Sequence, residues 1–233
     1  MLSKIRDIYV NFKRYRMTPL LDKVQRQQAI QNALSPFCTE KGFQYLARQN
    51  QFRRSTPTGF EAIILSVSHY DDLSLLEIHL GIRNEQIERL AFPFTNGVES
   101  FAPDSLTIVS SIGKLKGVKY ERHELIDLPS IKQVSSQIID FLQSKGLAFL
   151  ENYASITQID AALNLAPQTP TPLMPNQAHR CLRAITAARL NDHSQFEQLT
   201  LTYRQRLIDL HTPAPLVNRY DRLVNFLIGF NVN

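Results

Sequence analysis

The spacing of apolar residues changes twice along the chain, and this change constrains the fold more than any other feature. Up to Gly42, and again after Pro129, apolar residues recur at the spacing of an amphipathic helix. Between residues 43 and 126 apolar and polar residues tend to alternate, most clearly over residues 76–82. A helical segment, a run of strands and a second helical segment together predict an α+β fold.

Short runs with turn residues between them mark the strands. The candidates are residues 43–46, 51–54, 60–67, 76–82, 107–111 and 120–126. Parallel strands need long crossover connections, so we expect a mostly antiparallel sheet of about five to six strands flanked by helices. Residues 91–105 contain Pro93, Asn96-Gly97 and Pro103 and predict a long loop.

Four segments are predicted from this pattern. Residues 1–17 read as a basic amphipathic helix, and residues 18–163 as the α+β domain, whose first helix starts at the N-cap Thr18 and buries Val24. In the same domain, the helix after Pro129 is expected to end at Gly146. Residues 164–176 hold four prolines and predict a linker, and residues 177–233 form the C-terminal helices.

The net charge of +5 is confined to the first part of the chain. Residues 1–30 contain seven basic and two acidic side chains, so the remainder, with 19 of each sign, is neutral overall. A protein that binds nucleic acid across its body would be expected to carry a broader positive field, so a nucleic-acid partner is not expected there.

Cysteine usage and hydropathy bear on the cell compartment. The chain has two cysteines, Cys38 and Cys181, which give no disulfide framework. The first residues show no signal peptide, and the longest apolar stretch, residues 226–230, is too short to span a bilayer. We therefore expect a cytoplasmic protein without a membrane span.

Motifs of the common enzyme classes are missing from the sequence. It contains no G-x-S-x-G nucleophile elbow, no glycine-rich phosphate loop, no C-x-x-C and no H-E-x-x-H. The chain is therefore expected not to be an enzyme and to need no cofactor or metal. A zinc site at His179, Cys181 and His193 is disfavoured, because helical residues two apart do not share a face.

Two Glu/His pairs remain as candidate site residues. Glu77 with His79, and Glu121 with His123, are each spaced by two on a predicted strand, so each pair shares a face. If the strands are neighbours, two carboxylates and two imidazoles could converge for acid–base or metal chemistry. The simpler interpretation is the solvated side of a one-sided sheet, where such residues would be candidates for binding a partner.

Arginines next to aromatic residues form a second candidate. Arg53 and Arg54 follow Phe52 on a predicted strand. Arginine and aromatic side chains are enriched in the hot spots of protein interfaces, and they also stack on nucleic-acid bases. The alternative is that these side chains only pair with residues on neighbouring strands and have no role in binding.

Several short motifs give the chain a family resemblance. The segment FCTEKGF at 37–43 precedes an aromatic-plus-arginine strand at 52–54 and an apolar strand at 63–67. The segments LGI at 80–82, IGKL at 112–115 and GLAFLE at 146–151 follow in order. Over roughly residues 25–210 this order resembles the bacterial family catalogued as domain of unknown function 4304, with Lys114 in place of an acid and Ala148 in place of a proline.

The resemblance implies no catalytic residues, and some members of that family resemble immunity proteins, which bind and neutralise a cognate bacterial toxin. We therefore expect a non-enzymatic protein-binding module, with a protein toxin as the partner. Two alternatives stay open: a nucleic-acid or membrane-surface adaptor that acts through the basic first helix, and an enzyme that uses the Glu/His cluster.

Overall fold

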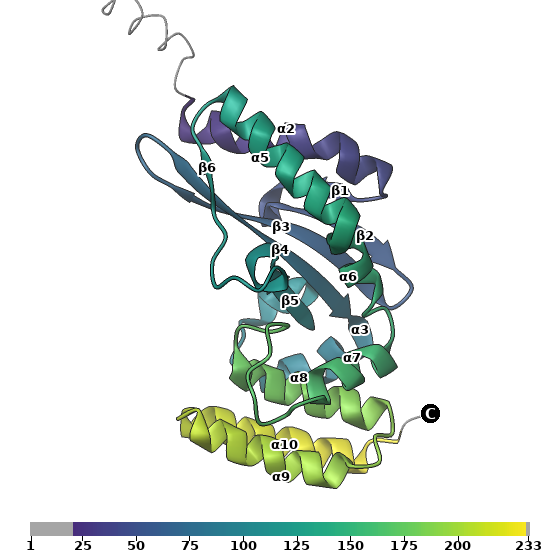
Figure 1. Ribbon diagram of the computed structural model, residues 1–233. Coiled ribbons are helices and arrows are strands. Elements are labelled where there is room, and N and C mark those ends of the chain that lie inside the picture. The colour runs from purple at the N-terminus through teal and green to yellow at the C-terminus, as the bar shows by residue number, and fades with distance from the viewer. Residues whose placement is uncertain (1–20, 232–233) are drawn as a thin grey trace, which may run out of the picture.

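The computed structural model describes residues 21–231, and Figure 1 shows their arrangement. An antiparallel sheet lies in the middle, and helices that precede and follow it in the sequence pack around it. This arrangement confirms the predicted α+β fold with its C-terminal helices. The predicted basic helix 1–17 and the predicted cap Thr18 lie outside the described residues. No helix within residues 21–231 combines the length and the hydropathy that crossing a membrane requires.

Helix α2 (Lys23–Glu40) is fixed at both ends by local chemistry. The Asp22 carboxylate accepts hydrogen bonds from the backbone N–H groups of Val24 and Gln25, and the Gln25 side chain accepts from Asp22 N–H, which completes a capping box. Beyond the other end, Gly42 takes a φ of +82°, which favours glycine and agrees with the predicted helix end.

The start of α2 differs from the prediction. The helix begins at Lys23, later than expected, because Asp22 provides the cap. Val24 was expected on the buried face but is 68% exposed, while Ile30 and Leu34 are fully buried. Val24 lies in the first turn of α2, and a single apolar side chain at the surface is normal in globular proteins.

All strands of the sheet run antiparallel to their neighbours. They are β1 (Gln44–Leu46), β2 (Gln51–Thr56), β3 (Gly59–His69), β4 (Ser74–Asn84), β5 (Ile108–Ser111) and β6 (His123–Leu125). The order is β1-β2-β3-β4-β5, and β6 pairs with the opposite end of the β4 edge that β5 uses. Each predicted strand is present, although β6 is shorter than residues 120–126.

The register of β3 and β4 assigns side chains to two faces. Ile63 lies opposite Leu80, and Leu65 opposite Ile78, so these four share one face, and all are buried in the core. Helices α2 and α5 pack side by side across this face (Figure 1). The opposite face carries Glu77, which lies across from Ser66. Toward the β3–β4 turn this second face is exposed at Ser66 and Ser68.

The helical segment after the sheet is longer than predicted. Helix α5 (Leu128–Phe141) continues through a π-helical turn (Leu142–Gly146) into α6 (Leu147–Glu151), so the predicted end at Gly146 is wrong. Gly146 has ordinary helical angles, and a Cβ there would lie 2.9 Å from Leu142 Cδ2. This glycine provides space for close packing rather than a helix stop.

Short helical elements lie within the connections of the sheet. They are the 3-10 turns at Ala47–Gln49, Phe92–Phe94 and Glu99–Asp104, and the helices α3 (Glu85–Ala91) and α4 (Ile112–Leu115). Helix α3 continues directly from β4, and Asn84 caps it by accepting from Ile87 N–H. The predicted loop 91–105 therefore contains two 3-10 turns.

Four helices complete the chain: α7 (Ile156–Asn164), α8 (Gln177–Leu190), α9 (Phe196–Asp209) and α10 (Ala214–Gly229). Helix α8 contacts α3, α7, α9 and α10, and its middle residues are buried on all sides. The buried apolar residues of the sheet, α7, α8, α9 and α10 form one continuous cluster.

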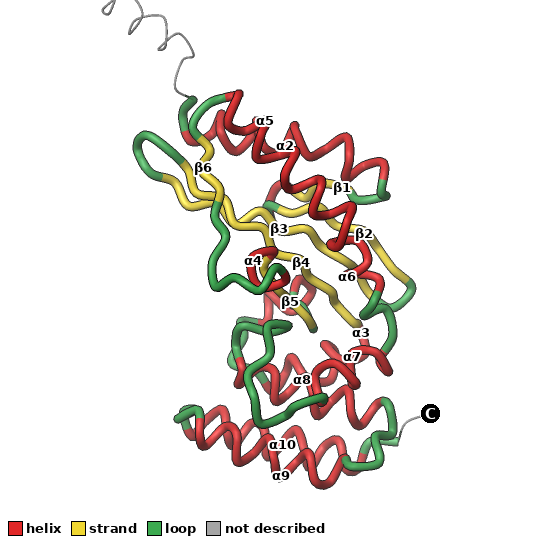
Figure 2. Tube along the Cα trace, in the orientation of Figure 1, coloured by secondary structure: helices red, strands yellow, loops and turns green. Residues whose placement is uncertain are grey.

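The proline-rich segment 164–176 is ordered by contacts with its surroundings. Figure 2 draws it as loop between α7 and α8. Arg180, 2% exposed, donates hydrogen bonds to the carbonyl groups of Leu163, Ala166 and Thr169. At the other end of the segment, Val109 N–H of β5 donates to the Leu173 carbonyl at 2.8 Å. The segment is therefore held between α8 and the edge of the sheet.

Candidate functional site

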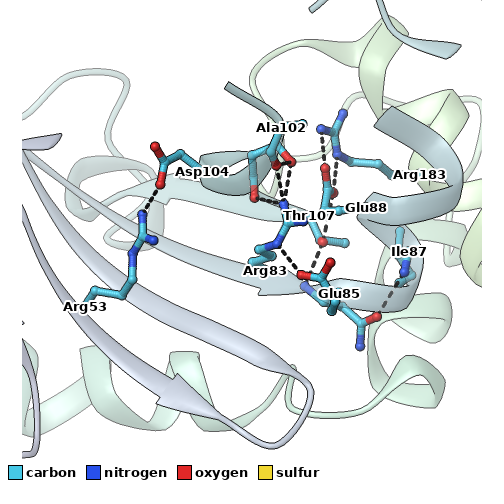
Figure 3. Close-up of polar contacts among 11 residues, drawn as sticks. Arg53, Arg83, Glu85, Ile87, Glu88, Ala102, Asp104, Thr107 and Arg183 are labelled. Carbon is cyan, nitrogen blue, oxygen red and sulfur yellow. Dashed lines mark hydrogen bonds and ion pairs between the residues drawn. The ribbon is translucent and has the colours of Figure 1, made fainter. Parts of the chain in front are cut away.

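The two predicted arginines of β2 bind groups within the protein, on opposite faces of the sheet. On the helix-covered face, Arg54 donates to Glu61 from Nε at 2.9 Å and from Nη2 at 2.7 Å, and its guanidinium lies 4.7 Å from the Phe43 ring centre. On the other face, Arg53 forms a 2.6 Å ion pair with Asp104 (Figure 3). Both side chains tie neighbouring segments together.

Glu77 and His79 lie together on the face of β4 opposite to the one that α2 and α5 cover. His79 Nε2 is 3.9 Å from a Glu77 carboxylate oxygen, and Arg122 Nε is 3.6 Å from the other. Burial lowers the pKa of His79, with Glu77 opposing the change and Lys114 adding to it. His79 is therefore mostly neutral at pH 7.

Glu121 and His123 form a separate pair. Their charged atoms are 3.4 Å apart, and Lys116 Nζ lies 2.7 Å from the Glu121 carboxylate. Because His123 pairs with Leu76 in the register of β6, it belongs to the helix-covered face, opposite to Glu77. The two Glu/His pairs therefore do not converge on one site.

The histidines and cysteine of α8 and its following turn also have local partners. His179 Nε2 lies 2.8 Å from Asn96 Oδ1, Cys181 donates to the Gln177 carbonyl, and His193 accepts from the backbone of Gln195. Within residues 21–231 no three His, Cys, Asp or Glu side chains are grouped so that they could hold a metal ion.

An exposed aromatic residue stands between two cations in the connection from α4 to β6. Tyr120 is 64% exposed, with Lys119 Nζ at 5.3 Å and the Arg122 guanidinium at 5.7 Å from its ring centre. Arg122 in turn contacts Glu77 of β4. We call Val118, Lys119, Tyr120 and Arg122 the Tyr120 patch. The sequence prediction singled out Glu121 and His123 beside it and missed the aromatic residue just before them.

A pocket of about 470 Å³ opens where β2, β3 and β4 meet α3 and the 3-10 turns. Its apolar walls include Phe60, Phe92 and Pro103, and its polar walls include Arg53, Arg83 and Arg89. Segments far apart in the sequence build it, so spacing along the chain gave no signal for it. Arg53 was predicted as a site residue and lines this pocket.

Next to the pocket, α3 and α8 are joined by a buried ion pair (Figure 3). Arg183 donates to Glu88 from Nε at 2.7 Å and from Nη2 at 2.8 Å, and the Thr107 hydroxyl donates to Glu88 Oε1 at 2.9 Å. Burial raises the pKa of Glu88, but the Arg183 charge and these hydrogen bonds outweigh it and hold the pKa below its usual range. Glu88 is therefore ionised at neutral pH.

Comparisons with known proteins found no match to this chain among family models, curated proteins or solved structures.

Proposed function

We propose that this protein is a non-enzymatic protein-binding module and that the Tyr120 patch is its contact surface. The observation that carries the proposal is the exposure of Tyr120, which keeps 64% of its surface in solvent while two cations flank its ring. Tyrosine and arginine are over-represented in the hot spots of protein interfaces. A partner that covers the ring would bury a large apolar area. The loss of conformational entropy would be small, because a tyrosine side chain has few rotatable bonds.

An ion pair with β4 supports the same surface. The Glu77 carboxylate forms an ion pair with Arg122 at 3.6 Å, so this cation is partly positioned before any partner arrives. Positioning of this kind lowers the entropy that binding must offset. The patch presents cationic and aromatic groups together, and we expect the partner to offer carboxylates around an apolar centre.

The identity of the partner is a finer proposal. We propose a bacterial protein toxin that the chain neutralises by binding, and the support is the sequence resemblance alone. Such a role fits a surface built for recognition, because neutralisation by binding asks for no reacting group in the immunity protein.

Affinity purification from the source cells tests the binding proposal. The full chain should recover a partner in stoichiometric amount, and Tyr120→Ala and Arg122→Ala should each lose it. Phe101→Ala is the matched control, because Phe101 is also 64% exposed and lies in the 3-10 turn Glu99–Asp104. If the control loses the partner and Tyr120→Ala keeps it, the patch is not the contact surface.

Growth assays test the finer proposal. The recovered partner, expressed alone, should stop growth, and co-expression of the full chain but not of Tyr120→Ala should restore it. A variant without residues 1–17 separates the adaptor alternative, which requires that segment. Loss of the partner in this variant, with no effect of Tyr120→Ala, would favour the adaptor.

A further inference from the structure

The pocket beside α3 contains an arginine that is buried but not fully satisfied. Arg83 is 6% exposed, and its Nε donates to Glu85 at 2.8 Å. Its Nη1 donates to the Ala102 carbonyl at 2.7 Å and to the Ser105 hydroxyl at 2.6 Å (Figure 3). These bonds fix the guanidinium plane at the pocket wall.

The remaining nitrogen of Arg83, Nη2, has no hydrogen-bond acceptor among the described residues. In this part of the chain the fully enclosed side-chain polar atoms without a partner are Ser110 Oγ and Arg206 Nε. Nη2 of Arg83 is not one of them, so it keeps contact with open space, and the open space next to Arg83 is the pocket. A charged donor that the described residues leave free can donate to water or to an acceptor bound in the pocket, and a charged acceptor forms the stronger bond.

The charges around the pocket leave one cation in excess. Three guanidinium groups line it, those of Arg53, Arg83 and Arg89, together with two carboxylates, those of Glu85 and Glu88. Asp104 and Arg183, which pair with Arg53 and Glu88 from outside the lining, add one charge of each sign. Arg89 is exposed at the rim and has no ion pair or hydrogen bond within residues 21–231, and its charge helps to lower the pKa of Glu85. A single negative charge would balance the site.

The rest of the wall is apolar and aromatic. Phe60 carries the Arg53 guanidinium 3.8 Å from its ring centre, and Phe92, Pro93 and Pro103 add further apolar surface. A flat apolar group can stack on such aromatic and guanidinium planes. A volume of about 470 Å³ falls in the range of small-molecule sites.

We propose that this pocket binds a small aromatic carboxylate. The carboxylate accepts a hydrogen bond from Arg83 Nη2 and pairs with Arg89, and the ring lies between Phe60 and Phe92. A monoanion satisfies both the free Arg83 donor and the single excess charge. A phosphate dianion would bring a second negative charge next to Glu85 and has no apolar body for the aromatic wall.

Titration of the full chain with 1-naphthoate tests this proposal, with amide signals followed by NMR. We expect saturable shifts at Gly59, Phe60 and Arg89. The neutral isostere 1-naphthamide should bind about tenfold more weakly, as expected when a charge-assisted hydrogen bond is lost. Inorganic phosphate should produce no saturable shift at these residues.

Two variants complete the test. Arg89→Gln should weaken 1-naphthoate binding about tenfold, because it removes the cation at the pocket rim that has no hydrogen bond or ion pair within residues 21–231. Arg222→Gln is the matched control, since Arg222 is an exposed arginine on α10, and it should leave binding unchanged. The proposal is overturned if 1-naphthoate causes no saturable shift, if the amide or phosphate binds equally well, or if both variants behave alike.

Discussion

Arg183 of α8 donates two hydrogen bonds, of 2.7 and 2.8 Å, to the fully buried carboxylate of Glu88 in α3. The two residues are 95 positions apart, and α3 follows the central strand β4 without a break. This pair therefore fastens the C-terminal helices to the sheet. Because desolvating two charges is costly, the intact pair adds little net free energy of unfolding. Removing only one partner is strongly destabilising, because it leaves the other charge buried and unpaired.

Removing one partner should be far more harmful than breaking an exposed pair. Glu88→Gln leaves Arg183 buried without its counter-charge and should lower the free energy of unfolding by about 3–5 kcal/mol. The exposed pair Arg204–Asp221 provides the control, and Arg204→Gln should cost about 0.5 kcal/mol or less. Urea unfolding followed by circular dichroism measures both, and equal losses would contradict this role for Glu88.

Acid should remove the same stabilisation. The pKa of Glu88 in the folded protein lies below its usual range, because the Arg183 charge and hydrogen bonds outweigh burial. A carboxylate with a depressed pKa contributes stability above its unfolded pKa, about 4.3, and that contribution fades as pH falls toward the folded pKa. The difference in unfolding free energy between wild type and Glu88→Gln should stay level near pH 6–7 and shrink below about pH 4.3. A difference that does not change with pH would refute this assignment.

Gly59 should tolerate a side chain much less well than Gly117. Both have positive φ, but a Cβ on Gly59 would lie 2.1 Å from the Arg83 carbonyl oxygen, whereas nothing lies within 4 Å at Gly117. Gly59→Ala should therefore cost about 2–4 kcal/mol and Gly117→Ala about 1 kcal/mol. Thermal and urea unfolding measure both costs. Gly59→Ala combines backbone strain with steric overlap, whereas Gly117→Ala causes backbone strain alone. Similar losses of unfolding free energy would count against the close approach of β3 and β4 at Gly59.

The cysteines should be inert in the folded protein. Burial raises the pKa of Cys38 and of Cys181 to about 12, so hardly any thiolate forms at pH 8. A chromogenic disulfide reagent should react with neither thiol in native buffer and with both in denaturant, since the sequence contains two cysteines. A fast-reacting thiol in native buffer would show that one of the two helices, α2 or α8, opens readily.

The alternating pattern at 76–82 was enough to predict β4, and turn residues on both sides located its neighbours. Whether Glu77 meets His123 depended on the register of β6 against β4, which alternation cannot fix. A shift of one residue would have moved His123 to the face of Glu77. Helix α3 was missed because its seven residues are too few to establish a helical period.

The pocket and the Glu88–Arg183 pair lay beyond sequence reasoning for a related reason. The pair joins residues 95 positions apart, and the pocket is lined by strands, α3 and 3-10 turns spread over residues 53–103. The composition of each of these segments alone is ordinary. The four prolines at 164–176 predicted a linker, and residues 165–176 lie in neither a helix nor a strand. They gave no sign of Arg180, whose hydrogen bonds to three carbonyl groups hold the segment in place.

Arg180 is therefore expected to control how firmly the segment 164–176 is held. Arg180→Met keeps most of the side-chain volume but leaves the carbonyl groups of Ala166 and Thr169 without this donor. The free energy of unfolding of this variant should be lower than that of wild type by about 1–3 kcal/mol. It should also be cleaved by a broad-specificity protease within residues 164–176 well before the rest of the chain, because local opening then costs less.

The control variant is Arg222→Gln, which changes an exposed arginine on α10 and should be cleaved at the wild-type rate. Wild-type cleavage of Arg180→Met would mean that the Leu173 contact with β5 holds the segment without help from α8.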